Sequence, residues 1–345
     1  MITDIDKPSQ TRTEETVPSP LLDVQGLGIN FHTARHPLSV VRDVTFAIRP
    51  GECVGLVGES GCGKTVTGLA LMGLLPLRTS RFAGRILFAG EDLLSLSERQ
   101  WRRIRGRRIG MIFQEPMSAL DPIFTIGEQI SETLRTHFRI GRAEARDRAI
   151  EALTKVGIPE PATRYDAYPH ELSGGMRQRA MIAMAISCEP DLLIADEPTT
   201  ALDVTVQAQI MDVLGELSAR SGMAMLFISH DLGLVSQTCS RIVTMYAGEV
   251  VETGVSDDML TRPRHPYTSG LLRSLPSFTP RKARLPSIPG RVPRPGEFSD
   301  GCRFEGRCRH STPSCKERQM LAPQPEGGLA RCWRAQELSL PGVLS

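Results

Sequence analysis

Short apolar runs alternate with longer amphipathic segments over most of the chain. The stretch from Val44 to Ile48 is apolar at every second position, as expected for a half-buried strand, and other runs are apolar throughout, as in strands buried on both faces. The fully apolar runs are residues 54–57, 109–113, 192–195 and 225–229. A period near 3.6 predicts helices over residues 64–75, 126–138, 142–156, 176–187 and 204–219. The alternation predicts an α/β domain with parallel strands.

This pattern has limits at both ends of the chain. Residues 1–20 are polar and show no period, which predicts a mobile N-terminal tail. The α/β domain is therefore assigned to residues 21–262. After Arg262 long periodic helices disappear, and this part of the chain holds 12 of the 25 prolines. Residues 263–345 are interpreted as a Pro-rich C-terminal extension that also contains cysteines.

The composition indicates where in the cell the protein acts and which partners it has. No run of 18 apolar residues is present, and the first 20 residues lack the order of a signal peptide. We expect a cytoplasmic protein that partner subunits hold at a membrane if it acts there. The 41 basic and 39 acidic residues give a net charge of +2, which does not favour a nucleic-acid partner.

The segment GESGCGKT follows the apolar run 54–57 and precedes a predicted helix. Its glycines allow backbone N–H groups to surround a polyphosphate, and the helix N-terminus adds favourable partial charge. Lys64 is expected to bind the β and γ phosphates, and Thr65 to bind Mg²⁺. The whole segment is predicted to bind ATP: Gly58, Glu59, Ser60, Gly61, Cys62, Gly63, Lys64 and Thr65.

The segment DLLIADEP supplies two carboxylates where a buried strand ends. Strand carboxyl ends face the ligand in open α/β sheets. Asp196 is expected to orient Mg²⁺, and Glu197 to act as general base on the attacking water. Together with the glycine-rich loop, this pair predicts an ATPase site.

Between these two segments lies LSGGMRQR, and with it the chain resembles the ABC-type ATPases. The resemblance implies that Ser173, Gly174 and Gly175 contact ATP bound to an opposing subunit in a head-to-tail dimer. Met176 departs from the Gln that many members carry there.

Further positions extend the resemblance over residues 21–276. It implies that Gln114 contacts Mg²⁺ and the attacking water, and that Asp203 communicates across the dimer. It also implies that His230 contacts the γ-phosphate and that Phe31 stacks on adenine, with His36 as the weaker candidate. Glu197, His230 and Gln114 are thus the predicted catalytic residues.

The extension narrows the subfamily. HPYTSGLLRSLPS and IPGRVPRPGEFSDGCRF resemble the tail of the ATPase subunits of peptide and nickel importers. The resemblance implies a motor that energises uptake of peptides or similar solutes from the cytoplasmic face of the inner membrane. The implied partners are a related ATPase subunit, two transmembrane permeases and an extracytoplasmic solute-binding protein.

The extension also gathers Cys302, Cys308, Cys315 and Cys332, and basic residues beside them favour thiolates. Four thiolates suit zinc or an iron–sulfur cluster. The resemblance favours a 4Fe–4S cluster, with Zn²⁺ and unliganded thiols as alternatives. Two other functions stay open: a soluble ABC protein that remodels nucleic acid, and a redox or iron-responsive regulator.

Overall fold

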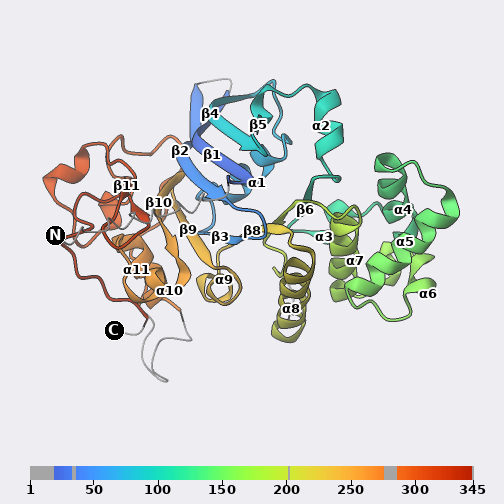
Figure 1. The fold of residues 1–345 in the computed structure, drawn as a ribbon. Helices are drawn as coiled ribbons and strands as arrows, with labels where there is room; N and C mark the ends of the chain where they lie inside the picture. The colour runs from blue at the N-terminus through green and yellow to red at the C-terminus, as the bar shows by residue number, and fades with distance from the viewer. Residues whose placement is uncertain (1–18, 33–35, 201–202, 276–285, 344–345) are drawn as a thin grey trace, which may run out of the picture.

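The first strands of the chain form an antiparallel sheet of their own, seen at the top of Figure 1. The computed structural model describes residues 19–32, 36–200, 203–275 and 286–343, so nearly all of the predicted N-terminal tail lies outside the described residues. Val44, Phe46 and Ile48 are buried, as the alternating pattern predicts. In spatial order the strands are β2 (Pro37–Ile48), β1 (Leu22–His32), β4 (Ser80–Phe88) and β5 (Glu91–Asp92).

The second sheet contains the strands that lead into the predicted site. β3, β6, β7, β8 and β9 are parallel, and β10, β11 and β12 add antiparallel pairs at one edge. The sheet is therefore mixed rather than purely parallel. Its strands in spatial order are β11 (Ala322–Pro323), β12 (Leu329–Ala330), β10 (Glu249–Val255), β9 (Arg241–Tyr246), β3 (Cys53–Val57), β8 (Ala224–Ser229), β7 (Leu192–Asp196) and β6 (Ile109–Ile112).

Both faces of this second sheet are covered, which explains its continuous apolar runs. Leu192 and Ile194 belong to the core shared with the first sheet and α1, whereas Leu193 and Ala195 belong to the core formed with helices. Because successive side chains of a strand point to opposite faces, a strand between two cores must be apolar at every position.

The predicted helices are present with shifts of a few residues at their ends. Among the described residues, none is long and apolar enough to cross a membrane. α1 ends earlier than predicted, because Gly73 adopts a positive φ of 60° just beyond it. The helices are α1 (Lys64–Leu71), α2 (Glu98–Ile104), α3 (Pro116–Ala119), α4 (Ile126–His137), α5 (Arg142–Lys155), α6 (Pro161–Tyr165), α7 (Gly174–Ile186), α8 (Val204–Ser221), α9 (Leu232–Thr238), α10 (Ser256–Thr261) and α11 (Pro266–Arg273).

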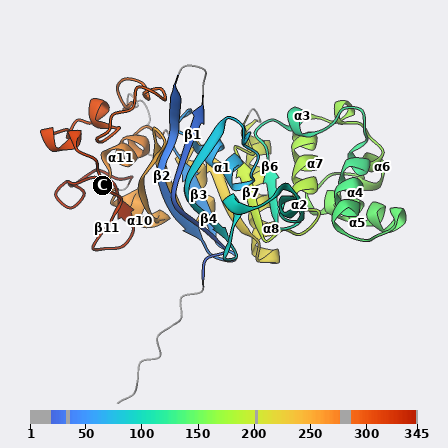
Figure 2. The ribbon, with the colours of Figure 1, turned by 90° about the horizontal axis from the view of Figure 1, so that it is seen from above.

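The C-terminal extension and the helical block α4–α7 lie at opposite ends of the molecule in both views (Figures 1 and 2). The extension is joined to the second sheet. Glu252 of β10 pairs with Ala330 of β12, and Tyr246, Tyr267 and Phe304 share a small buried core. The change in composition at Arg262 did not predict that a later segment, β12, would pair with β10 at the edge of the second sheet.

Candidate active site

The loop between β3 and α1 has a backbone that requires glycine. Gly58 has φ +155°, and a Cβ there would lie 2.2 Å from the carbonyl oxygen of Met245. Gly63, the N-cap of α1, has φ +101°. These positions keep the loop narrow and turn its backbone towards the start of α1, the geometry in which N–H groups can receive phosphate oxygens.

Lys64 is the first residue of α1, and its side chain reaches into this loop; only 4% of its surface is exposed. Its Nζ donates to the carbonyl oxygen of Gly58 at 2.7 Å and lies 3.3 Å from that of Glu59. These neutral acceptors hold a buried positive charge beside the helix start. An anion entering the loop would gain a charge-assisted hydrogen bond from this ammonium.

Thr65 and Asp196 bring together two oxygen ligands from different elements. The Thr65 hydroxyl donates to Oδ1 of Asp196 at 3.3 Å. The pKa of Asp196 is raised from 3.8 to about 6: burial is the largest cause and the neighbouring Glu197 adds to it, whereas the Thr65 hydrogen bond and Lys64 oppose the rise. Hydroxyl and carboxylate oxygens are hard donors of the kind that Mg²⁺ prefers. The pair is therefore chemically suited to a magnesium ion.

Glu197 sits on a strained turn at the end of β7. Its φ is +46°, and its backbone N–H donates to the Ile228 carbonyl of β8 at 2.9 Å. Left-handed backbone at a non-glycine residue costs about 1 kcal/mol or more and is common at functional sites. This turn fixes the direction in which the carboxylate leaves the sheet.

Three side chains hold the Glu197 carboxylate. Gln114 Nε2 donates to Oε2 at 3.1 Å, and the Thr200 hydroxyl donates to the same oxygen at 2.9 Å. Nδ1 of His230 lies 3.2 Å from Oε1. The structure thus brings together the three residues predicted to be catalytic. Thr200 was missed by the sequence analysis, although its position three residues after Glu197 in a turn was the available signal.

Comparison with known proteins shows that the chain has close relatives along nearly its whole length. It is 49% identical over 321 residues to a probable peptide ABC transporter ATP-binding protein of Sinorhizobium fredii, covering 92% of this chain and 96% of the relative. The chain belongs to the ABC transporter family. Within that family it is an ATP-binding subunit, and such subunits are ATPases.

Other matches agree with this membership. A putative peptide import ATP-binding protein of Brucella abortus is 49% identical over 314 residues, covering 91% of this chain and 95% of the relative. Residues 41–200 match the family described as "ABC transporter", and residues 251–315 match "Oligopeptide/dipeptide transporter, C-terminal region".

Solved ABC structures share the fold. The ATP-binding cassette MJ0796, in a dimeric post-hydrolysis state bound to ADP and Pi, gives a TM-score of 0.61 at 26% identity, covering 68% of this chain and 98% of that one. For cbiO1 of Clostridium perfringens the TM-score is 0.60 at 26% identity, over 70% and 90% of the two chains. The prediction of an ABC-type ATPase fold is confirmed.

The residues expected to serve a second ABC subunit lie at helix starts. Ser173 caps α7 by accepting from the Met176 N–H at 3.3 Å, and Gly174 and Gly175 form the first turn. Asp203 caps α8 by accepting from the Val206 N–H at 3.0 Å. Both Ser173 and Asp203 are exposed, so a partner could reach them.

The remaining nucleotide candidate, Phe31, lies near the end of β1. It is half-buried and packs against the core between the two sheets. His36 begins the described chain after a gap at residues 33–35. Part of the ring of Phe31 is thus committed to packing, and its proposed contact with adenine must use the exposed part.

Three of the four cysteines of the extension differ from the prediction that basic neighbours favour thiolates. Burial raises the pKa of Cys302 to about 12 and also raises those of Cys308 and Cys332. Only Cys315 has a lowered pKa: burial raises it, but hydrogen bonds with Thr312 and other neighbours outweigh that effect. Among the described residues, no group of three or more His, Cys, Asp or Glu is placed to hold a metal ion. The structure gives no support to the iron–sulfur or zinc prediction.

Proposed function

We propose that this chain is the ATP-hydrolysing motor of an importer for di- or oligopeptides or similar small solutes. The observation that carries the ATPase part is the Glu197 carboxylate, held by Gln114, Thr200 and His230 beside Asp196. Support for peptide uptake comes from the match of residues 251–315 to the oligopeptide and dipeptide transporter C-terminal region and from the relatives named as peptide import proteins.

Binding of ATP begins at the glycine-rich loop. The N–H groups of residues 58–65 and the Lys64 ammonium bind the β and γ phosphates, as in other phosphate-binding loops. Thr65, Asp196 and Gln114 would hold Mg²⁺, which neutralises charge on the phosphates. Phe31 offers the exposed part of its ring to adenine. Lys64 then also stabilises negative charge on the transferring phosphoryl group.

Hydrolysis depends on the Glu197 carboxylate. As Oε1 or Oε2 takes a proton from the attacking water, the water oxygen forms a bond to the γ-phosphorus and the bond to ADP breaks. Gln114 and Thr200 fix the orientation of the carboxylate through Oε2. His230, with 56% of its side chain exposed, would contact the γ-phosphate of bound ATP.

The resemblance to ABC-type ATPases supports completion of the site by a second subunit, and the exposed caps of α7 and α8 are accessible to one. Ser173, Gly174 and Gly175 would contact ATP held by a related ATPase subunit in a head-to-tail dimer, and Asp203 would contact that subunit. The dimeric state of MJ0796 supports the pairing of two ATPase subunits. The further partners proposed are two permeases and an extracytoplasmic solute-binding protein, with this chain on the cytoplasmic face of the membrane.

Transport in reconstituted vesicles tests the proposal. The chain would be assembled with the permeases and second ATPase from neighbouring genes, and ATP-dependent uptake of radiolabelled di- and tripeptides measured. We expect uptake with the wild-type chain and none with Glu197→Gln. A chain that hydrolyses ATP but copurifies with nucleic acid, and not with permeases, would overturn the transport proposal.

A metal centre in the extension is a separate proposal, and no step of hydrolysis depends on it. Its support is the sequence resemblance and the presence of four cysteines within 31 residues; among the described residues no group of side chains is arranged to hold a metal ion. Anaerobic purification with analysis of iron, sulfide and zinc tests it, with Cys308→Ser as the comparison. Iron and sulfide in similar amounts, lost in the variant, support a 4Fe–4S cluster. One zinc would replace that assignment, and metal-free protein that still supports transport would end it.

A further inference from the structure

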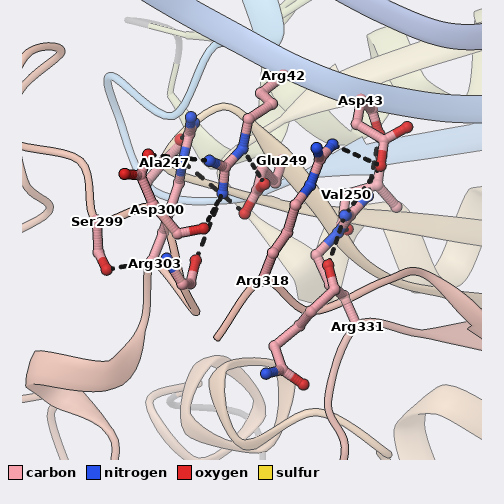
Figure 3. A network of polar contacts seen from close by, with 12 residues as sticks. Arg42, Asp43, Ala247, Glu249, Val250, Ser299, Asp300, Arg303, Arg318 and Arg331 are labelled. Atoms are coloured by element: carbon pink, nitrogen blue, oxygen red, sulfur yellow. Dashed lines mark hydrogen bonds and ion pairs between the residues drawn. The ribbon is translucent and has the colours of Figure 1, made fainter. Parts of the chain in front are cut away.

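Arginines next to the cysteines bind the extension to the two sheets through hydrogen bonds and ion pairs. Arg331, next to Cys332, donates to the Val250 carbonyl at 2.8 Å and to Asp43 Oδ2 at 3.1 Å. Arg303, next to Cys302, donates to the Ala247 carbonyl and lies 3.9 Å from Glu249. Figure 3 shows Arg331 reaching towards Asp43 of β2 and Val250 of β10, and Arg303 near Ala247 and Glu249. Each has only 3% of its side chain exposed, so these contacts fix the extension in place.

A third such arginine reaches the phosphate-binding loop itself. Arg307, next to Cys308, pairs with Glu59 through Nη1 to Oε2 at 2.7 Å and Nη2 to Oε1 at 3.0 Å. Its side chain is 7% exposed. Its Nε donates to the Pro289 carbonyl at 2.8 Å, so the extension holds the guanidinium from behind. A bidentate pair of this kind fixes both the position and the charge of the carboxylate.

The backbone of Glu59 is held by the extension too. Its N–H donates to the hydroxyl of Tyr267 at 2.8 Å. Tyr267 is fully buried, and its ring lies 4.6 Å from that of Tyr246 and 5.4 Å from that of Phe304. A rigid aromatic group therefore determines where this residue of the loop can lie. Both contacts come from residues beyond the ATPase domain assigned to 21–262.

Glu59 places a carboxylate in a loop that must bind a negatively charged triphosphate. It directly follows Gly58, and the carbonyl oxygens of both residues face the Lys64 ammonium. A free carboxylate here would compete for Lys64 and repel the phosphates, because two like charges a few ångströms apart interact strongly in a partly buried site. The guanidinium of Arg307 neutralises the carboxylate and holds it among residues of the extension.

We propose that Arg307 and Tyr267 are positioning residues of the ATP site, which makes the C-terminal extension a part of the nucleotide-binding machinery. Arg307 removes the charge of Glu59 from the loop, and Tyr267 holds its backbone. The inference rests on the proposed ATP-binding function. It predicts that damage to these contacts raises the KM and Kd for ATP while leaving kcat nearly unchanged.

A double-mutant cycle tests the charge role on the full chain. ATP affinity would be measured for wild type, R307Q, E59Q and R307Q/E59Q, at low and high salt. Loss of hydrogen bonds to a charged group predicts that R307Q weakens ATP binding by about 10-fold or more. In the E59Q background the same change should weaken binding by less than about 3-fold, because no carboxylate is left to neutralise. Y267F should weaken binding several-fold.

Arg309→Gln provides a matched control, since Arg309 is two residues away and exposed. We expect ATP affinity and melting temperature close to wild type. If R307Q binds ATP normally, or weakens binding equally with and without E59Q, the positioning role of Arg307 is refuted. Thermal melting of all variants identifies a general loss of folding, which would also refute it. Failure of the wild-type chain to bind ATP, by contrast, would refute the proposed function itself.

Discussion

Nδ1 of His230 lies 3.2 Å from Oε1 of Glu197, although the two residues end different strands. β7 and β8 are adjacent and parallel, with Asp196 opposite Ile228, so their carboxyl ends present these side chains side by side. His230 and Gln114 approach the carboxylate from opposite neighbours in the sheet, because β6 is the other neighbour of β7. The sheet order thereby places the proposed base between an imidazole and an amide.

Replacing Glu197 with Gln keeps the shape of this group and removes its ability to accept a proton. We expect ATP hydrolysis by the assembled transporter to fall by about 10²–10⁴-fold, the usual contribution of a positioned general base. ATP binding should survive, and the ATP-bound dimer should accumulate. Steady-state phosphate release and gel filtration with ATP measure the two effects. Hydrolysis within a few-fold of wild type would show that another group is the base.

Replacing Lys64 with Ala removes the ammonium that lies inside the phosphate-binding loop. Charge-assisted hydrogen bonds contribute about 1.5–3 kcal/mol each, so ATP affinity should fall by about 10- to 150-fold. Lys155, on α5, pairs with exposed carboxylates and gives a control in K155A. Isothermal titration with ATP, together with thermal melting, separates loss of binding from loss of folding. Unchanged affinity in folded K64A protein contradicts the assignment of this loop.

Gly58 is predicted to be irreplaceable for a steric reason. An added Cβ would lie 2.2 Å from the Met245 carbonyl oxygen, so G58A must move either the loop or β9. Gly90 also has a positive φ, 84°, but open space around a Cβ, so G90A costs only the backbone strain of about 1 kcal/mol. Urea unfolding should show a greater loss of stability in G58A than in G90A. Equal losses would mean that the close approach to Met245 does not constrain the loop.

The sequence predicted the strands and helices that carry the ATP site, because their patterns are local. The run 192–195 had to be apolar at every position, since it lies between two cores. GESGCGKT likewise specifies a loop through its own glycines. By contrast, contacts between distant segments left no local pattern: nothing in the sequence around Arg307 points to Glu59, and nothing near Leu329 predicts pairing with β10. The cysteine spacing suggested ligands, but spacing does not determine how four side chains are oriented in a segment with few regular elements.

The last prediction concerns the stability of the free protein as a function of pH. Burial, the largest effect, raises the pKa of Asp196 from 3.8 to about 6, and 2% of the residue is exposed. Between these two values the folded protein holds a proton that the unfolded chain has released. The free energy of unfolding must therefore fall as pH rises through this window. Above about pH 6 the loss in the free energy of unfolding is complete, and it amounts to roughly 3 kcal/mol for a pKa shift of about two units.

Asp196→Asn removes the ionisation while keeping an oxygen that can accept from Thr65. We expect the variant to gain stability over wild type as pH rises from 4 to 6, with the difference then constant at higher pH. Glu252, whose pKa burial raises to about 7, titrates in both proteins, so its contribution cancels in the comparison. Urea unfolding between pH 4 and pH 8 measures the difference. With magnesium and ATP at pH 8, the wild type should become more stable than the variant. The Asp196 carboxylate offers the cation a negative charge, whereas the Asn amide does not. A difference between the two proteins that stays constant from pH 4 to pH 8 would show that Asp196 ionises as it does in the unfolded chain.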